Sequence, residues 1–341
     1  METTLIVQKE ILSNLFITNN DSNERMDIYK FLCNDYRGYK LICDIKLSDY
    51  KKHMEDNPMW DILIDNMNTF CYEENISSYI LEDAFYDDLG EYNIFLINES
   101  NNVCNDLTSK YGFVYLNDRN IESNWKVFNE IRKGVPLKVT KSTLIPEEQR
   151  VDAWSKLDFI STPLTSIIVF DNYILKDSDL QRLRDNLYPL LEILLAKSRS
   201  YQVVTVTIIT MPSKKCIKQI RGQILAHIRS KGYFNAEINI VKHHKRYYPD
   251  GFEGLHSRYI LTNYLRIKTE DSFNYFQPSG KINNESDIRV DLCLESKNKP
   301  LFMKELEDLN IYFSKIDNNP DNPVEDCQVM FHPHKTNDLL N

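Results

Sequence analysis

The sequence predicts an α/β protein in which a sheet flanked by helices follows a second, smaller α/β part. Residues 165–170 form a continuous apolar run, which is typical of a strand buried on both faces of a parallel sheet. Leucines recur at intervals of three and four between Leu180 and Leu194, so we expect an amphipathic helix that covers this sheet. The chain has 341 residues, of which 42% are hydrophobic, and this length suggests two domains with sizeable cores.

The second half alternates between strands and helices. Asp171 closes the first buried strand, and Pro189 should kink or divide the leucine-rich helix that follows. The β-branched residues within 201–210 predict a second strand, because they alternate with other residue types. A helical stretch over about 214–230 and a third strand over 236–241 come next. This alternation favours a parallel sheet.

The first half shows a similar alternation. Apolar groups near residues 5, 11 and 15 recur at helical spacing. The later expected elements are a strand over 38–44, a helical stretch that includes 59–64 and 70–72, a strand over 92–98, a helix over 103–110 and a strand over 113–116. The order strand, helix, strand at this spacing predicts a βαβ unit.

Three regions follow from this organisation. Residues 1–150 are expected to form an acidic α/β domain of unknown role, and residues 151–316 a second domain. Residues 317–341 should be a loose polar tail, because they open with a run of asparagine, aspartate and proline. The best linker between the domains is 134–146, which contains two prolines and a glycine.

Charge is distributed unevenly along the chain. Between Asp44 and Asp106, 15 acidic residues and 3 lysines leave a charge of −12. Between Lys214 and Arg246, nine basic residues and one glutamate leave +8, although the whole chain carries −9. Such asymmetry indicates a polyanionic partner at one site, and the acidic segment 44–106 offers a surface to a protein partner.

The basic run ends in the residues Lys242, His244, Lys245 and Arg246, which we take as candidate phosphate-binding groups. Two tyrosines follow the run directly, and tyrosines beside cations suit base stacking as well as ordinary packing. The consecutive His243 and His244 would point to opposite faces of a strand, so they cannot chelate a metal together.

The stretch from His256 to Asn263 comes next and carries the strongest chemical signal. Histidine can attack phosphorus or transfer a proton near neutral pH. Arg258 shares the face of His256 on an extended strand, because side chains alternate with period two. A guanidinium there can hold a phosphate oxygen by a charge-assisted contact, and Asn263 adds a short polar side chain five residues further on.

This stretch resembles a degenerate phospholipase D motif, in which His-x-Lys is followed four residues later by Asp. Here Arg258 stands in place of the lysine and Asn263 in place of the aspartate. The wider neighbourhood, about residues 160–316, resembles the phospholipase D-like domain that follows MIT modules and related prokaryotic domains. The shared features are the buried strand ending in Asp171-x-Tyr173-Ile, the order of elements up to His256, and the trailing segments 271–276 and 287–291. The resemblance implies a phospholipase D-like sheet flanked by helices.

The function that the resemblance implies is recognition of a phosphate-bearing polymer, nucleic acid before lipid, with His256, Arg258 and Asn263 at the site. One alternative is a metal-independent phosphodiesterase or nuclease. That reaction needs two histidines, so a chain with one motif would act as a homodimer. Another alternative is a protein-interaction module that uses the acidic first half. Related prokaryotic domains occur in antiphage and mobile-element systems, which makes an antiviral role a further expectation.

Asp171 allows two interpretations. It stands at the carboxyl end of a buried strand, where α/β sheets place functional groups. Aspartate is also a preferred residue at the beginning of a helix, and Asp171 with Tyr173 recurs as a structural feature in the resembling domains. We favour the structural or capping role for both residues.

Composition excludes several classes of function. The chain has 9 glycines and no glycine-rich loop, so we expect no nucleotide cofactor. It also lacks the roughly 18 consecutive apolar residues of a membrane span and the basic start of a signal peptide. The 7 cysteines show no CxxC spacing, which favours reduced thiols and a cytoplasmic protein.

No metal is expected at either of two candidate clusters. Glu82, Asp83, Asp87 and Asp88 surround an aromatic pair, and such acidic runs usually form a solvated helix face. Near the C-terminus, Cys327, His332 and His334 supply too few ligands for a structural zinc site.

Overall fold

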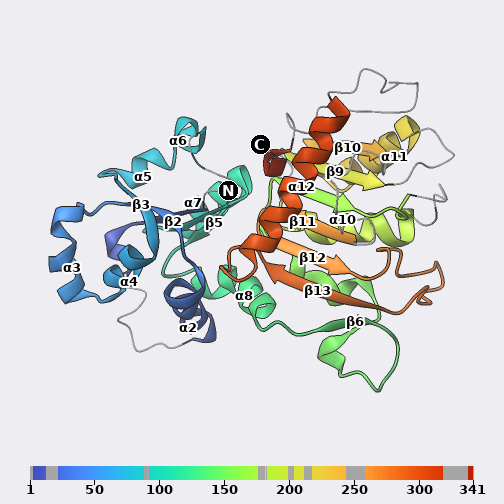
Figure 1. Cartoon of the computed structure of the whole chain (residues 1–341), viewed down its shortest axis with the longest axis horizontal. Helices are drawn as coiled ribbons and strands as arrows, with labels where there is room; N and C mark the ends of the chain where they lie inside the picture. Colours follow the sequence, from blue (N-terminus) through green and yellow to red (C-terminus); the bar gives the residue numbers. More distant parts are fainter. Residues whose placement is uncertain are drawn as a thin grey trace. The chain divides into compact units, whose positions relative to one another are not determined.

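The computed structural model describes residues 3–12, 22–87, 89, 92–175, 181, 183–198, 203–210, 217–242, 258–317 and 337–340. The chain divides into two compact units (Figure 1). Unit 1 consists of Met1–Arg132 and Leu292–Pro300, and unit 2 consists of Lys133–Asp291 and Leu301–Asn341. Both units are α/β: unit 1 contains a parallel sheet, unit 2 contains a mixed sheet, and helices flank each sheet.

The described strands of unit 1 form a sheet with the order β3-β2-β1-β4-β5. These strands are β1 (Thr3–Val7), β2 (Tyr39–Cys43), β3 (Met67–Tyr72), β4 (Tyr92–Leu96) and β5 (Val114–Leu116). Neighbouring strands all run parallel. Strands β1, β4 and β5 are buried along their whole length, as expected for a parallel sheet that helices cover on both faces.

Helices connect these strands. In chain order the helical elements are α2 (Asn23–Lys30), η1 (Phe31–Asp35), η2 (Leu47–Asp49), α3 (Tyr50–Asp56), α4 (Met59–Asn66), α5 (Ile76–Tyr79), α6 (Asp83–Asp87), α7 (Asn101–Tyr111) and α8 (Ile121–Arg132). Aromatic side chains from α6, β4, α7 and β5 pack together on this sheet, with Phe95 and Tyr115 stacked at 4.2 Å between ring centroids.

Most of the elements predicted for unit 1 are confirmed, but two predictions are wrong. Residues 3–7 were expected to continue a helical pattern and instead form the central strand β1. Residues 70–72 were also expected to be helical and belong to strand β3. In both places pairing with a neighbouring strand overrides the local apolar spacing, because each segment is rich in β-branched or aromatic residues that suit a sheet.

The described strands of unit 2 form a sheet with the order β10-β9-β8-β11-β12-β13-β6-β7. These are β6 (Leu137–Val139), β7 (Arg150–Val151), β8 (Ser166–Phe170), β9 (Val204–Thr210), β10 (Ala236–Lys242), β11 (Arg258–Thr262), β12 (Leu265–Thr269) and β13 (Ser286–Leu292). Strands β8, β9 and β10 are parallel, whereas β11 is antiparallel to both β8 and β12. The three parallel strands match the predictions, and β6 lies inside the stretch 134–146 that the sequence favours as a linker.

Helices flank this sheet as well. The helical elements of unit 2 are η3 (Glu147–Gln149), η4 (Trp154–Ile160), η5 (Leu183–Leu187), α10 (Tyr188–Leu195), α11 (Ile217–Ser230), α12 (Lys299–Asp317, from Leu301 on) and η8 (Asp338–Leu340). Pro189 lies in the first turn of α10, directly after the π-helical η5, so the predicted division of the leucine-rich segment is confirmed. Helix α12 is anchored to the sheet by Glu305, which pairs with the buried Arg266 of β12 at 2.7 Å.

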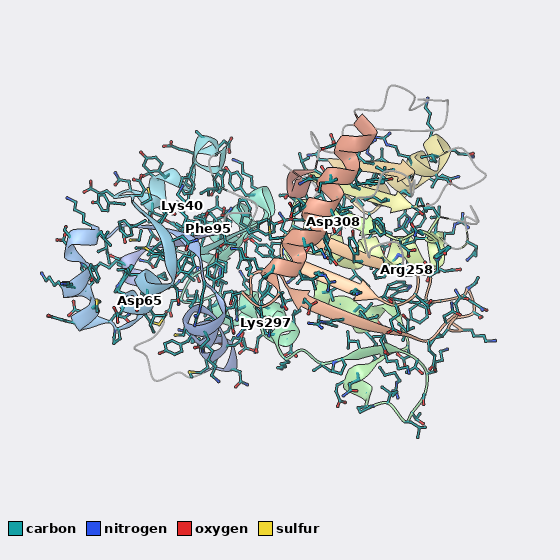
Figure 2. The ribbon with its side chains drawn as sticks, viewed as in Figure 1. Lys40, Asp65, Phe95, Arg258, Lys297 and Asp308 are labelled. Atoms are coloured by element: carbon teal, nitrogen blue, oxygen red, sulfur yellow. The ribbon has the colours of Figure 1, made fainter. Side chains whose placement is uncertain are left out.

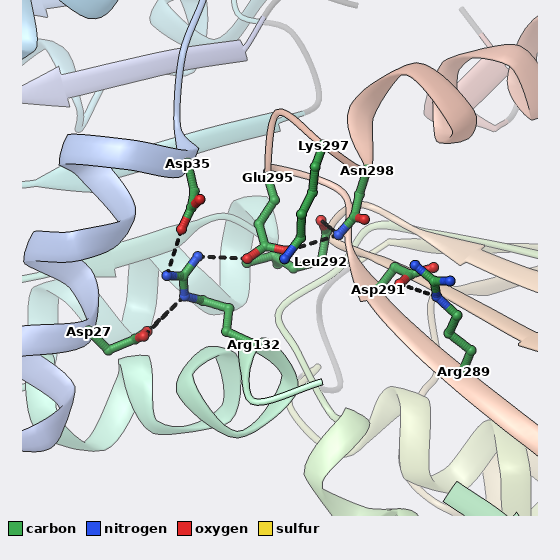
Figure 3. A network of polar contacts seen from close by, with 9 residues as sticks. All are labelled: Asp27, Asp35, Arg132, Arg289, Asp291, Leu292, Glu295, Lys297 and Asn298. Carbon is green, nitrogen blue, oxygen red and sulfur yellow. Dashed lines mark hydrogen bonds and ion pairs between the residues drawn. The ribbon is translucent and has the colours of Figure 1, made fainter. Parts of the chain in front are cut away.

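A polar network holds the returning segment 292–300 within unit 1 (Figure 3). The side chain of Arg132 is 8% exposed and binds Asp27 at 3.0 Å, Asp35 at 2.9 Å and Glu295 at 2.8 Å. The backbone N–H of Ser296 also donates to the carbonyl oxygen of Asp35 at 2.7 Å. Burial raises the pKa of Glu295, and the charge of Arg132 opposes that rise. One arginine therefore joins the segment to α2 and η1.

Two further expectations concern the chain as a whole. Among the described helices, none combines the length and the apolar character that crossing a membrane requires. The described cysteines, which are Cys33, Cys43, Cys71, Cys104 and Cys293, form no disulfide bonds.

Candidate functional site at one edge of the mixed sheet

The register of the unit 2 sheet aligns five residues at one edge. Thr210 pairs with Lys242, and Arg258 pairs with Thr269. Phe170 pairs with Ile209 on one side and with Tyr259 on the other. Asp171 is the next residue after Phe170, so it stands between Thr210 and Arg258. We call Lys242, Thr210, Asp171, Arg258 and Thr269 the edge row. Paired residues on neighbouring strands share a face of the sheet, and this edge is where the parallel strands β8, β9 and β10 end.

Asp171 is fully buried and holds two loops together. Its Oδ1 accepts a hydrogen bond from the backbone N–H of Tyr173 at 2.8 Å. Its Oδ2 accepts from the Ser272 hydroxyl at 2.7 Å and from the Phe273 N–H at 2.8 Å. Burial raises the pKa of Asp171, while these three donors and the charge of Arg258 act in the opposite direction. These contacts favour the structural interpretation of Asp171, although the residues of the helix that it was expected to cap lie outside the described ranges.

Arg258 begins β11 and is partly exposed (Figure 2). Its guanidinium carbon lies 5.1 Å from the centre of the Tyr173 ring, which is the geometry of a cation–π contact. Its Nη1 stands 3.5 Å from the carbonyl oxygen of Glu270, and Asn274 donates to the carbonyl of Tyr173 at 3.0 Å. Residues that follow β8 and β12 thus set the position of the Arg258 side chain.

Asn263 lies at the other end of β11 from Arg258. Its Oδ1 accepts from the backbone N–H groups of Thr165 at 2.8 Å and Ser166 at 3.1 Å, and the side chain is fully buried. It lies five positions after Arg258, which corresponds to about 17 Å along the extended strand. Sequence reasoning placed both residues at one site, but the fold does not bring them together. Asn263 instead joins the turn after β11 to the start of β8.

Several predicted site residues lie outside the described ranges. These are His244, Lys245, Arg246 and His256. The backbone of Lys242 is described as the last residue of β10, so the basic run begins at the edge row. The chain also returns to this edge at Arg258, which opens β11.

The described side chains at this edge carry no excess of positive charge. Arg258 contributes one positive charge, and the exposed Glu270 and Asp271, which follow β12, contribute negative ones. A net attraction for an anion at this edge would therefore depend on the basic residues that follow β10 along the chain.

Sequence reasoning missed three residues of this edge, namely Thr210, Ser272 and Asn274. Thr210 is recognisable only once the register places it beside Asp171. Ser272 and Asn274 reach the loop after β8 from about a hundred residues further along the chain. A single sequence carries no signal for such a distant contact.

Unit 1 has a comparable edge where its parallel strands end, and there the polar side chains bind one another. Gln8, after β1, accepts from the N–H of Asn98 at 2.5 Å and donates to the Ser77 hydroxyl at 2.8 Å. Asn98, after β4, donates to Glu10 at 2.6 Å. Open α/β sheets often bind ligands at the topological switch point, which lies here between β1 and β4. Hydrogen bonds between Gln8, Asn98 and Glu10 bridge this position.

The two candidate metal clusters are not supported as metal centres by the described residues. Asp83 forms an ion pair with Lys110 at 2.6 Å and accepts a hydrogen bond from Tyr111, and these contacts lower its pKa. No group of three or more His, Cys, Asp or Glu in the described ranges is arranged to hold a metal ion. Asp88 and the C-terminal set Cys327, His332 and His334 lie outside those ranges.

Comparisons with known proteins give no relative: no protein-family model matches the chain, and no curated protein matches it.

Proposed function

We propose that the edge row of unit 2 recognises a phosphate-bearing polymer, nucleic acid before lipid, in a domain that resembles a degenerate phospholipase D fold. The observation that carries the proposal is the placement of Arg258 in the same row as the end of β10. The only long basic run that the sequence analysis identified starts at that strand end, with Lys242, and continues through Lys245 and Arg246. The edge row thereby contains a positioned guanidinium and the residue at which the basic run of the sequence begins.

The contacts of Arg258 suit such a role. A guanidinium held beside an aromatic ring retains planar N–H donors, and such donors match the geometry of phosphate oxygens. Only one residue stands between His256 and Arg258 in the chain, so the Cα atoms of these two residues are within about 7 Å of each other. Histidine would add a second donor near the same phosphate.

Binding without cleavage fits the described residues better than hydrolysis. Both carboxylate oxygens of Asp171 already accept hydrogen bonds from the protein, so Asp171 is poorly placed to act as a general base. The pattern His-x-Arg followed five residues later by Asn occurs once in the sequence, so a reaction with two such histidines would require a second copy of the chain. Cleavage is therefore an outcome that the test must be able to detect.

The test incubates the purified chain with labelled single- and double-stranded DNA and RNA, with and without EDTA. Arg258→Ala and a triple variant that replaces Lys242, Lys245 and Arg246 by glutamine are compared with wild type. Two controls match them in charge. Arg289→Ala changes an exposed arginine of β13, and a second triple variant neutralises the exposed Lys197, Arg289 and Lys304.

A mobility shift without cleavage, weakened in the two edge variants and kept in both controls, is the expected result. Cleavage that survives EDTA and disappears in His256→Ala would replace the proposal by a phosphodiesterase of phospholipase D type. No shift at low salt would reject nucleic acid as the ligand. Salt-sensitive binding to basic proteins would then favour an interaction module built on segment 44–106.

A further inference from the structure

Thr210 is a buried residue with an unusual side chain for its position. It ends β9, it is 2% exposed, and no described residue lies within hydrogen-bond distance of its hydroxyl. A buried hydroxyl without a partner destabilises a fold relative to an apolar side chain of the same shape. On the same face of β9 the alternate residues are Val204, Val206 and Ile208, so a valine at 210 would continue the pattern.

Three other buried threonines of this sheet have side-chain partners. Thr207 accepts from Asn337 at 3.0 Å, and Thr269 shares a hydrogen bond with Ser286 at 2.8 Å. Thr262 accepts from the N–H groups of Tyr264 and Leu265 at 3.3 Å and 3.0 Å. Thr210 thus differs from these three threonines, because no described residue is a hydrogen-bond partner of its hydroxyl.

The neighbours of Thr210 in the edge row are the groups that the proposed function uses. Lys242 pairs with it on one side and Asp171 stands beside it on the other. Asp171 is not a hydrogen-bond partner of the Thr210 hydroxyl, and its oxygens accept from Tyr173, Ser272 and Phe273 instead. Arg258 lies one strand further, about 10 Å from Thr210 between Cα atoms at the usual strand spacing. An arginine side chain can reach across part of that distance.

We propose that the Thr210 hydroxyl is a ligand-binding group that donates a hydrogen bond to a non-bridging phosphate oxygen of bound nucleic acid. The inference rests on the proposed function and extends it by one residue on the strand next to Asp171. Thr210 and Arg258 then contact the phosphate backbone from the two sides of Asp171, and the hydroxyl of Thr210 gains a partner that no described residue supplies.

The experiment measures binding of a labelled single-stranded oligonucleotide by fluorescence anisotropy, together with the thermal unfolding temperature, for three variants. Thr210→Val keeps the shape and removes the hydroxyl, whereas Thr210→Ser keeps the hydroxyl. Thr162→Val is the matched control. Thr162 is also fully buried with a hydroxyl that lacks a described partner, but it precedes β8 at the opposite end of that strand.

We expect Thr210→Val to bind about tenfold more weakly, because a hydrogen bond to a charged phosphate is lost, and to unfold at the same temperature as wild type or above it. Thr210→Ser should stay within about twofold of wild-type affinity, since the donor is retained. Thr162→Val should show the same thermal behaviour as Thr210→Val with unchanged affinity.

Wild-type affinity in Thr210→Val would overturn the inference and leave the proposed function intact. A lowered unfolding temperature in Thr210→Val would also overturn it, because the hydroxyl would then have a structural partner. Equal weakening in Thr162→Val would show an indirect effect of buried substitutions and would reject a specific contact. Absence of binding by the wild-type chain would instead remove the proposed function itself.

Discussion

Arg132 shows how one side chain can organise a folded unit. It ends α8, and its guanidinium contacts three carboxylates that come from α2, η1 and the segment 292–300 (Figure 3). The same group lies over the Phe31 ring at 4.9 Å, and Asp27 also accepts from the indole N–H of Trp125 at 2.8 Å. The carboxylates would repel one another without the cation between them.

Replacing Arg132 should therefore cost much more than a surface ion pair. For Arg132→Ala we expect the free energy of unfolding of unit 1 to fall by about 3–5 kcal/mol, because partly buried carboxylates lose their partner. Arg132→Lys should recover only part of this loss, since an ammonium cannot bind three carboxylates in a planar fork. Urea unfolding followed by hydrogen exchange would assign the change to unit 1.

Arg289 is the control for this substitution, because it is 69% exposed and pairs with Asp291 at 2.7 Å. Arg289→Ala should change the free energy of unfolding by less than about 1 kcal/mol. Similar losses in the two alanine variants would contradict the importance assigned to the buried network.

Single residues also mark the limit of what the sequence predicts. The sequence identified Asp171, Tyr173 and Arg258, and the fold brings these three together. It did not indicate that Ser272 would bind Asp171, because the two residues lie 101 positions apart. The sequence also grouped Asn263 with Arg258 because of their spacing. The two residues lie at opposite ends of the extended strand β11, so they cannot share one site.

At the scale of elements, prediction succeeded where one local signal was strong. Strands β8 and β9 follow from apolar or β-branched runs, and α10 follows from its leucine spacing. Strand β3 was missed because Met67–Tyr72 directly follows the residues of α4, and no turn residue separates the two elements. The edge pairing of β3 with β2 decides its conformation, and that pairing is not visible in a local window.

Two glycines in the helical connections occupy different backbone conformations, and replacing each by alanine tests the effect of that difference on stability. Gly112 follows α7 with φ of 72°, a left-handed conformation that ends the helix. Gly222 lies inside α11, where an added Cβ would meet no atom within 4 Å. We expect Gly112→Ala to destabilise the protein by about 1–2 kcal/mol and Gly222→Ala to stabilise it by about 0.5–1 kcal/mol.

The unfolding temperatures of the two variants can be compared directly, because each variant replaces a glycine by an alanine. Shifts of the unfolding temperature in opposite directions are the expected result. Shifts in the same direction would mean that one of the two backbone conformations has been assigned incorrectly.

At the scale of the whole molecule, the distribution of charge is the main clue to function. A chain of net charge −9 does not coat nucleic acid by general attraction, so binding must depend on a small group of cations. Lys242, Lys245, Arg246 and Arg258 form that group in the proposed function. The proposal can therefore be tested by counting the ions that binding displaces.

The expected slope of log K against log salt concentration is about −3 for a single strand, since each neutralised phosphate contributes about −0.7. The triple variant at Lys242, Lys245 and Arg246 should have a slope smaller in magnitude than about 1 if it still binds. Titrations over a range of salt concentrations measure both values. An unchanged slope in the triple variant would place the polyanion elsewhere on the molecule.

The segment 292–300 has a consequence for synthesis. Unit 1 includes Leu292–Pro300, and Glu295 in this segment is one of the carboxylate partners of Arg132. During synthesis, Arg132 therefore lacks one partner until Glu295 has been added to the chain. When residues up to 132 have been made, the segment 292–300 of unit 1 is still missing, and residues 133–291, which are most of unit 2, are made in between. The usual order, in which an N-terminal domain is complete before the next one begins, does not hold for this chain.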